Sequence, residues 1–448
     1  MGWRATSRPL LSNSFGRGRK GMRPASDNVL SAWGHEMTQQ EREGWFIVGS
    51  LFVIFLIVFG GGYDTVPVFL PKLVTSLGWN RTKVSILPSA LAFSAGASVL
   101  IVGWLLDRVE ARIVMVVGAL IAGTSFLIAS QANSLSTMIV AYLMMGVAIS
   151  AGTVVPGSFV VANWFQGRRG LAMGISNSGT TTGGMVMSLI GSAVMLRWGW
   201  RVGYIALALP MLLIAVPLIV LMVRSRPPGA VKMTVAEAGE KLEGFETAQA
   251  LRTRSFWMIV IARFCFASAA TGTVIHMVAY LIEVGYKPAN AALVMSLMFG
   301  IATIGKITMG FLADRLTARI TLLINFLIQA TVLLLSFGLS HLIVIGFFML
   351  IFGLTFAAPL TLLPLLVAES MGLRRFGSLQ GLTSLSETFG AVVGPIVAGG
   401  IFDLTHSYVY AYELFIVVNL IGAAVTFTCV SYEREQSRMV TAAAAASA

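Results

Sequence analysis

Twelve apolar blocks, each about 20 residues long or longer, follow one another along the 448 residues of the chain. A helix needs about 20 apolar residues to cross the roughly 30 Å hydrocarbon core of a bilayer, so each block predicts one membrane-spanning helix. The blocks are continuous, unlike the alternating strands of an outer-membrane barrel. Only 11% of the residues are charged, whereas a soluble domain carries about 25%, which excludes an ordinary soluble enzyme. The predicted spans are 45–70, 84–106, 113–130, 136–165, 171–196, 202–223, 256–282, 291–313, 320–340, 342–368, 376–402 and 411–430.

The basic residues predict the orientation of the chain in the membrane. The formal net charge is +12, but the Lys and Arg residues lie mainly in short loops between apolar blocks, so we expect no nucleic-acid partner. Of the 31 Lys and Arg residues, 23 fall on the side of the two termini and six on the opposite side. Short cytoplasmic loops carry such an excess. Both termini are therefore predicted to be cytoplasmic, in a bacterial-type inner membrane.

The longest hydrophilic break between spans divides the chain into two halves. The predicted parts are a disordered cytoplasmic tail at 1–44, a six-helix bundle at 45–223, a cytoplasmic linker at 224–254, a second six-helix bundle at 255–432 and a cytoplasmic tail at 433–448. No small-residue cleavage site precedes the long first apolar block, so no signal peptide is expected. Translation from Met22 or Met37 in place of Met1 would remove most of the N-terminal tail.

A repeat with an offset of 207 residues relates the two halves. Residues 103–113 (GWLLDRVEARI) match residues 310–320 (GFLADRLTARI), and the same offset carries Gly170 to Gly377. Two six-helix halves of parallel topology can rock about a solute site near the bilayer midplane and open it to one side at a time. The repeat therefore predicts alternating access. A receptor that does not transport is the alternative.

The repeated motif Gly-x-Leu-x-Asp-Arg and the long central linker resemble the major facilitator superfamily over nearly the whole chain. The resemblance implies an all-α fold with twelve helices in two pseudo-symmetric bundles. Asp107, near a helix end, is expected to accept hydrogen bonds from helix N-terminal amides or to pair with basic residues of the other half. Such a contact would break when the carrier opens. The gating residues predicted from the two motifs are Asp107, Arg108, Arg112, Asp314, Arg315 and Arg319.

Shorter stretches resemble the monocarboxylate and oxalate/formate porter group of that superfamily. They are residues 60–63 (GGGY), 68–71 (VFLP) and 168–175 (RRGLAMGI), His276-x-x-x-Tyr280, and Gly394-Pro395. The resemblance implies that Lys306 stands where the group commonly has a substrate-binding arginine. Lysine also holds an anion, but without the bidentate geometry of arginine. Glu387 and Asp64 stand where members of the group have lysines, so the charge is reversed at both positions.

Charged side chains inside spans are functional candidates, because each costs roughly 2.5 to 3.5 kcal/mol to insert. Lys306 in span 8 is expected to bind substrate or couple, with snorkelling as the alternative. Glu387 in span 11 is expected to carry a proton, and an ion pair with Lys306 is an alternative compatible with that role. Asp64 in span 1 is expected to take part in coupling or to face an outer vestibule. Arg263 in span 7 is expected to snorkel or to make a gate contact.

Polar side chains complete the predicted site. His276 titrates near physiological pH and is expected to bond the solute or relay a proton, or to be structural. Asn177 belongs to a polar run on span 5 that is expected to line the interface between the halves, where nearby glycines permit close packing. Cavity walls are expected at Tyr63, Tyr280 and Ser384. The predicted substrate-binding residues are thus Lys306, His276, Asn177, Tyr63, Tyr280 and Ser384, with Glu387 and Asp64 as proton-coupling residues.

These features predict a secondary active transporter. The sequence has no phosphate-binding loop, zinc-ligand cluster or nucleophile elbow, so we expect no enzyme activity, cofactor or metal site. The expected function is proton-coupled uptake of a small organic metabolite, nearest a monocarboxylate, by a monomer surrounded by membrane lipid. Asp64, Glu387 and Lys306 together give a net charge of minus one, which leaves the substrate class open. The alternatives are uptake of a neutral or heterocyclic metabolite such as a riboflavin-like vitamin, and export of a drug-like compound.

Overall fold

The computed structural model describes residues 39–79, 81–165, 167–227 and 242–447. Residues Glu43–Ala448 form one compact unit. Most of the tail predicted to be disordered, residues 1–38, lies outside the described residues. Positions 39–44 of that tail are already helical, because the first helix begins at Gln39.

Twelve helices of the described part are long and apolar enough to cross a membrane, and the membrane-crossing stretches of these helices end within four residues of the predicted ends. In the first half, span 1 is α2 (Gln39–Phe59), η1 (Gly60–Asp64) and α3 (Val66–Leu77), span 2 is α4 (Arg81–Leu106), span 3 is α5 (Ala111–Gln131), span 4 is α6 (Leu135–Gly152) with α7 (Val154–Trp164), span 5 is α8 (Arg169–Trp198), and span 6 is α9 (Trp200–Pro210), η2 (Met211–Ala215) and α10 (Val216–Met222).

The second half also has six spans. Span 7 is α13 (Arg254–Glu283), span 8 is α14 (Pro288–Arg315), span 9 is α15 (Ala318–Leu333) with η4 (Leu334–Gly338), span 10 is α16 (Leu342–Phe356) with α17 (Pro359–Met371), span 11 is α18 (Phe376–Thr405), and span 12 is α19 (Val409–Thr428). The prediction of an all-α fold with two pseudo-symmetric six-helix bundles is confirmed.

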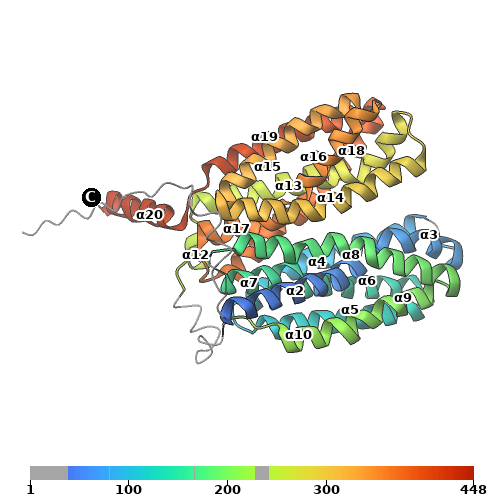
Figure 1. Ribbon diagram of the computed structural model, residues 1–448, viewed down its shortest axis with the longest axis horizontal. Helices are drawn as coiled ribbons and strands as arrows, with labels where there is room; N and C mark the ends of the chain where they lie inside the picture. Colours follow the sequence, from blue (N-terminus) through green and yellow to red (C-terminus); the bar gives the residue numbers. More distant parts are fainter. Residues whose placement is uncertain (1–38, 80, 166, 228–241, 448) are drawn as a thin grey trace, which may run out of the picture. The chain divides into compact units, whose positions relative to one another are not determined.

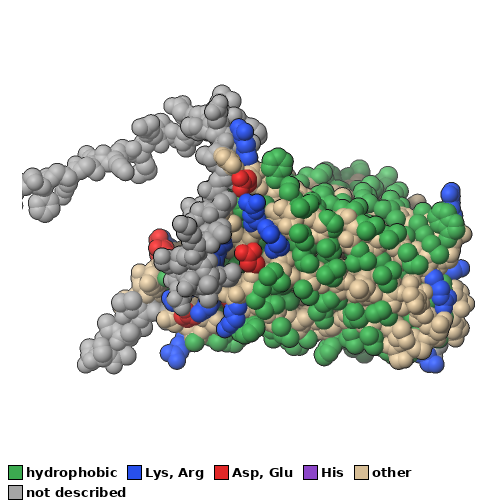
Figure 2. Space-filling model, turned by 90° about the horizontal axis from the view of Figure 1, so that it is seen from below, with side chains coloured by type: hydrophobic (Ala, Val, Ile, Leu, Met, Phe, Trp, Pro, Cys, Tyr) green, Lys and Arg blue, Asp and Glu red, His purple; other side chains and the backbone are tan. Residues whose placement is uncertain are grey.

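The two bundles lie side by side, with α2 to α10 in one and α13 to α19 in the other (Figure 1). They meet along two helix pairs, α8 with α14 and α4 with α18. The end of the spans where the linker residues 224–227 and 242–253 lie is called the linker side below, and the opposite end the far side. Hydrophobic side chains cover the middle of the face in Figure 2, and charged side chains gather toward the two ends, as a membrane requires.

Among the described residues, spans 1, 4, 6 and 10 are interrupted along their length. The interruption in span 1 shapes the interior. Residues Gly60, Gly61 and Gly62 are buried and begin the π-helical turn η1, which ends at Asp64. Gly60 packs so closely on the backbone of Gly183 in α8 that a Cβ atom would overlap it. Helix breaks in transporters are tolerated where they line a site, and π-helical turns occur frequently at functional sites. The sequence GGG thus allows span 1 to bend beside α8 and sets the position of Asp64.

The linker and the C-terminal segment both have structure on the linker side. Residues Gly244 and Gly372 form an isolated β-bridge, and the short helix α12 (Thr247–Ala250) follows it. The predicted tail at 433–448 is occupied by a helix, α20 (Tyr432–Ser447). The side chain of Glu435 in α20 accepts hydrogen bonds from the backbone amides of Arg254 and Ser255, at 3.1 and 3.5 Å. It thereby caps the N-terminus of α13.

Candidate functional site

Two aspartates join the halves on the linker side. Asp107 follows α4 and accepts hydrogen bonds from the backbone amides of Gly377 and Ser378 at the start of α18, at 3.0 and 2.9 Å. Asp314, near the end of α14, accepts from the amides of Gly170 and Leu171 at the start of α8, at 2.6 and 2.8 Å. A carboxylate there satisfies amides that have no partner within the helix and faces the positive end of the helix dipole.

The two contacts are equivalent by the repeat, because each residue of the first contact corresponds to one of the second at an offset of 207. We call them the two latches: the contact of Asp107 with the start of α18, and the contact of Asp314 with the start of α8. The contact expected of Asp107 from the sequence is present. Glycines allow the approach, because a Cβ at Gly103 would overlap the backbone at Gly377, and one at Gly310 would overlap the backbone at Gly170. Each latch therefore sits where two helices of different halves touch through their backbones.

The four arginines of the repeated motif make their contacts inside their own halves. The guanidinium groups of Arg108 and Arg315 lie over the rings of Trp104 and Phe311, at 4.1 and 5.0 Å from the ring centroids. Arg112 donates from Nε to the carbonyl oxygen of Val223 at 2.7 Å, and Arg319 donates to that of Phe427. Their described contacts thus hold span ends together and do not cross between the halves.

Lys306 is buried at the interface and does not snorkel. Its side chain is 0% exposed, and its ammonium group donates to the carbonyl oxygen of Asn177 at 3.1 Å and to the hydroxyl of Thr180 at 2.6 Å. Both acceptors belong to α8 of the other half. Thr180 lies ten residues beyond Gly170, about 15 Å from the latch at 1.5 Å per residue and so near the middle of the bilayer. Among the described residues, no carboxylate oxygen lies within 4.0 Å of the ammonium group.

Asp64 lies about one helical turn farther toward the far side. Its carboxylate packs on Gly184 of α8, where a Cβ would come within 2.6 Å of Oδ2, and Gly184 is four residues beyond Thr180. The hydroxyl of Ser188 donates to the Asp64 carbonyl oxygen at 3.3 Å. Among the described residues, no hydrogen bond or ion pair reaches the carboxylate itself, although its charge acts on Lys306. The two groups form a separated pair of opposite charges along α8.

Glu387 is paired with Arg263, which corrects two expectations. Nη1 of Arg263 lies 2.6 Å from Oε2 of Glu387 and 3.0 Å from the hydroxyl of Ser384, and Nη2 lies 2.9 Å from the side-chain oxygen of Gln380. Arg263 is 1% exposed, so it does not snorkel. The alternative of an ion pair between Glu387 and Lys306 is wrong. Spacing could not reveal the true pair, because it joins spans 7 and 11, which pack together only in the folded bundle.

The other predicted site residues are spread over the molecule. Asn177, whose carbonyl oxygen accepts from Lys306, donates from its side chain to the carbonyl oxygen of Leu360 at 3.3 Å, and so connects Lys306 to span 10. His276 lies 3.0 Å from the carbonyl oxygen of Pro395 and 3.3 Å from the hydroxyl of Tyr408. Tyr280 is buried and donates to the carbonyl oxygen of Ser336 at 2.6 Å. Tyr280 lies seventeen residues from Arg263 in the same helix, about 25 Å along the axis, so it does not share a site with Arg263.

Tyr63 is exposed next to Asp64, where its ring packs against Phe59 with centroids 5.4 Å apart. Two polar residues that accept hydrogen bonds from the buried charged groups were not among the predicted site residues: Gln380 and Thr180. Thr303 pairs its hydroxyl with that of Thr181 at 3.0 Å across the interface. Thr180 belongs to the polar run of span 5 that was predicted to line the interface. Uncharged polar side chains in spans are common, so no sequence signal singles out Gln380 or Thr303. In the described residues no group of three or more His, Cys, Asp or Glu side chains could hold a metal ion.

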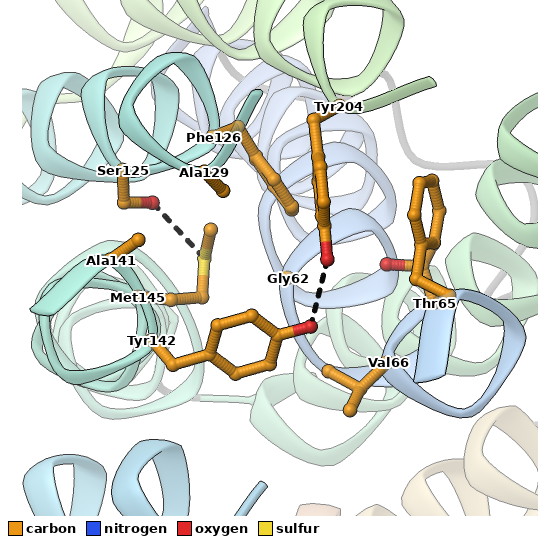
Figure 3. Close-up of a pocket in the computed structure, with 11 residues that line it drawn as sticks. Gly62, Thr65, Val66, Ser125, Phe126, Ala129, Ala141, Tyr142, Met145 and Tyr204 are labelled. Atoms are coloured by element: carbon orange, nitrogen blue, oxygen red, sulfur yellow. Dashed lines mark hydrogen bonds between the residues drawn. The ribbon is translucent and has the colours of Figure 1, made fainter. Parts of the chain in front are cut away.

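A small hollow lies behind span 1, inside the first bundle (Figure 3). Gly62 and Thr65 border it on one side, and the hydroxyls of Tyr142 and Tyr204, 3.0 Å apart, close it on another. Its volume is about 10 Å³, which holds about one water molecule. The hollow is too small for a metabolite, so it is a packing defect next to η1 and not a solute site.

Comparison with known proteins decides the family. A model of the Major Facilitator Superfamily matches residues 51–395. The chain belongs to this superfamily. It is similar to the MFS-type transporter YcxA of Bacillus subtilis, with 25% identity over 85% of this chain and 94% of that protein. It is also similar to monocarboxylate transporter 3 of Rattus norvegicus, with 25% identity over 86% of this chain and 80% of that protein.

A solved structure has the same fold. The proton:xylose symporter XylE superposes with a TM-score of 0.71, at 11% identity, over 87% of this chain and 96% of that protein. The resemblance to the superfamily inferred from the repeated motif is confirmed. The chain is thus a multi-pass membrane transporter of the major facilitator superfamily.

Proposed function

We propose that this transporter carries a small monocarboxylate together with a proton. The observation that supports the proposal most directly is the separated pair beside α8. Among the described residues, the buried ammonium group of Lys306 bonds only to neutral oxygens, and the carboxylate of Asp64, packed on Gly184, has no direct hydrogen-bond or ion-pair partner. A carboxylate solute would supply Lys306 with an anionic partner. A proton on Asp64 would remove the competing negative charge.

The charges of the four ionisable groups in the middle of the spans support a solute that is a monoanion. Asp64 and Glu387 carry negative charge, and Lys306 and Arg263 positive charge, so the four cancel when all are ionised. Binding one carboxylate to this set would leave a net negative charge within the membrane, which is costly. Protonation of Asp64 makes the set positive by one charge, and a single carboxylate then restores neutrality. A proton and a monoanion therefore bind best together, and carrying both across the membrane in the same direction is symport.

The latches supply the conformational part of the cycle. We infer from the excess of Lys and Arg on the linker side that this side is cytoplasmic, in an inner membrane. Both latches, and the contact of Lys306 with α8, lie in the linker-side half of the spans. The structure then represents a state closed to the cytoplasm, in which Asp64 lies on the outer side of Lys306. A solute and a proton from outside would reach Asp64 first, and opening the latches would release both inward from a single chain.

The experiment that tests the proposed substrate is thermal unfolding of the purified full chain in detergent. We would use pyruvate, lactate, oxalate, glycine and riboflavin at pH 5.5 and 7.5, since a specific ligand stabilises the folded state by RT ln(1 + [L]/Kd). Pyruvate and lactate are expected to raise Tm more at pH 5.5. Lys306→Gln should abolish the rise, while Lys72→Gln, at an exposed lysine on the far side, should leave it unchanged. Equal stabilisation of the wild type and Lys306→Gln would contradict the role of Lys306.

A neutral solute is the second candidate, and one observation favours it. With Asp64 ionised, the four mid-span charges already cancel, so an uncharged solute would leave the balance unchanged. In the same experiment, stabilisation by riboflavin alone, independent of pH, would favour this candidate and make Asp64 a hydrogen-bond acceptor for the solute.

A further inference from the structure

The ion pair between Arg263 and Glu387 lies at the level of Lys306 but on the other interface helix. Glu387 lies ten residues beyond Gly377, the first latch amide of α18, just as Thr180 lies ten residues beyond Gly170 in α8. The repeat offset carries Thr180 onto Glu387. Both positions are therefore about 15 Å from their latches. Glu387 thus occupies in the second half the position from which Thr180 contacts Lys306 in the first.

The contacts of α18 place Glu387 beside the interface between the halves. Thr388, the next residue, packs on Gly96 of α4 in the other half. The side chain of Glu387 is 22% exposed although it lies in the middle of a span, whereas its partner Arg263 is 2% exposed. Glu387 is therefore the more exposed member of the pair, and its carboxylate compensates the charge of the buried guanidinium group.

We propose that Glu387 determines the charge of the accepted solute, by cancelling Arg263 so that the transporter accepts monoanions and rejects dianions. This inference rests on the proposed function and deepens it. Two buried cations, Lys306 and Arg263, are within the spans, enough for a dianion. Three side-chain oxygens already occupy Arg263, from Glu387, Gln380 and Ser384. One positive charge is left for the solute, that of Lys306.

Removing the charge of Glu387 while keeping its shape tests the inference. Glu387→Gln retains an oxygen that can accept from Nη1 of Arg263 but leaves the guanidinium charge uncompensated. A unit charge a few Å from a ligand, at an effective dielectric constant of about 20, changes binding by roughly tenfold or more. The expected result is that the affinity for malonate, a dianion at pH 7.5, rises roughly tenfold or more relative to that for pyruvate, a monoanion of similar size.

The measurement is the thermal shift of the purified full chain titrated with malonate and with pyruvate at pH 7.5. The double variant Arg263→Gln with Glu387→Gln is the matched control, because it removes both charges; its preference between the two anions should be that of the wild type. Arg263→Gln alone leaves an extra negative charge and should weaken binding of both anions. This variant keeps the inference testable if Glu387→Gln does not fold.

Two outcomes would overturn the inference. One is a malonate-to-pyruvate affinity ratio in Glu387→Gln equal to that of the wild type. The other, where Glu387→Gln does not fold, is unchanged anion binding by Arg263→Gln. A wild type that binds no pyruvate would contradict the proposed function instead, and a gain of malonate binding by Glu387→Gln would still support the inference about Glu387.

Discussion

At the scale of single residues, the pair of Arg263 and Glu387 is expected to be a strong determinant of stability. Arg263 is fully buried and donates to three side chains. Removing one partner of a buried ion pair leaves an uncompensated charge and costs about 3 to 5 kcal/mol. Because Glu387 keeps partial exposure, we expect Arg263→Met to lower the free energy of unfolding by roughly 3 kcal/mol, measured by denaturant unfolding in detergent.

The matched control for this prediction is the double variant Arg263→Met with Glu387→Met. Replacing both members of a buried pair by apolar residues is often close to neutral, so the double variant should be more stable than the single one. A double variant less stable than Arg263→Met would show that the pair is not the source of the loss.

Glu246 in the linker is a second residue with a measurable effect, this time on pH dependence. Its carboxylate forms ion pairs with Arg375 and Arg374, at 2.9 and 3.0 Å. The hydrogen bond from Arg375 lowers the pKa of Glu246 below its usual 4.5. The ion pairs hold the linker segment 243–250 against the residues just before α18, and the pKa of Glu246 is lowered only while this contact is formed. The ionised carboxylate therefore stabilises the contact above about pH 4.5, and this stabilisation is lost as the pH falls through the lowered pKa.

We therefore expect amides of residues 243–250 to be protected from hydrogen exchange between pH 5 and 7.5, and to lose that protection below about pH 4.5. Glu246→Gln should exchange faster throughout and show no such transition. Glu243→Gln, at an exposed neighbouring acid, is the control and should behave as the wild type. A transition that persists in Glu246→Gln would assign it to another group.

At the scale of elements, the latches are expected to hold α4 against α18 and α8 against α14. Each carboxylate accepts two amide hydrogen bonds, and a hydrogen bond to a charged group contributes roughly 1.5 to 3 kcal/mol. Asp107→Ala should therefore shift the population toward a state open on the linker side. Spin labels at Gly167, just before α8, and at Leu316, just after α14, should move apart, because the helix pair that they flank keeps its own latch.

Cysteines introduced for these labels can be modified selectively, because both native cysteines, Cys265 and Cys429, are buried. Glu110→Ala, in the same loop as Asp107, is the control and should leave the distance distribution unchanged. If Asp107→Ala also left it unchanged, the latch would have no part in holding the interface closed.

Much of this element-scale picture follows from the sequence. Apolar block length predicted the spans to within four residues, because the bilayer fixes the length of a helix. The repeat pointed to Asp107, with helix N-terminal amides or basic residues of the other half as its partners, but not to the start of α18 in particular. The partner of Arg263 could not be predicted, because packing of α13 on α18 sets it. The packing of Asp64 against Gly184 could not be predicted either, because it depends on the π-helical turn η1.

At the scale of the whole molecule, the two halves repeat in backbone but differ in charge. The latches and their glycines occur twice, whereas Lys306 corresponds by the offset of 207 to Val99 and Glu387 corresponds to Thr180. A backbone that is repeated in the two halves is suited to a rocking motion, because it gives both halves equivalent contacts on the linker side. In the proposed function, the asymmetric charges provide one site for an anion, at Lys306, and one for a proton, at Asp64. The repeated features thus serve the proposed motion, and the features that differ between the halves serve the proposed selectivity.

The central claim, that Asp64 couples a proton to the movement of a monocarboxylate bound at Lys306, is tested most directly by transport in proteoliposomes. Uptake of labelled pyruvate driven by an inward proton gradient would be compared with pyruvate exchange without a gradient, for the wild type and Asp64→Asn. We predict gradient-driven accumulation in the wild type, and in Asp64→Asn its loss with exchange retained. Undiminished proton-driven accumulation by Asp64→Asn would contradict the account.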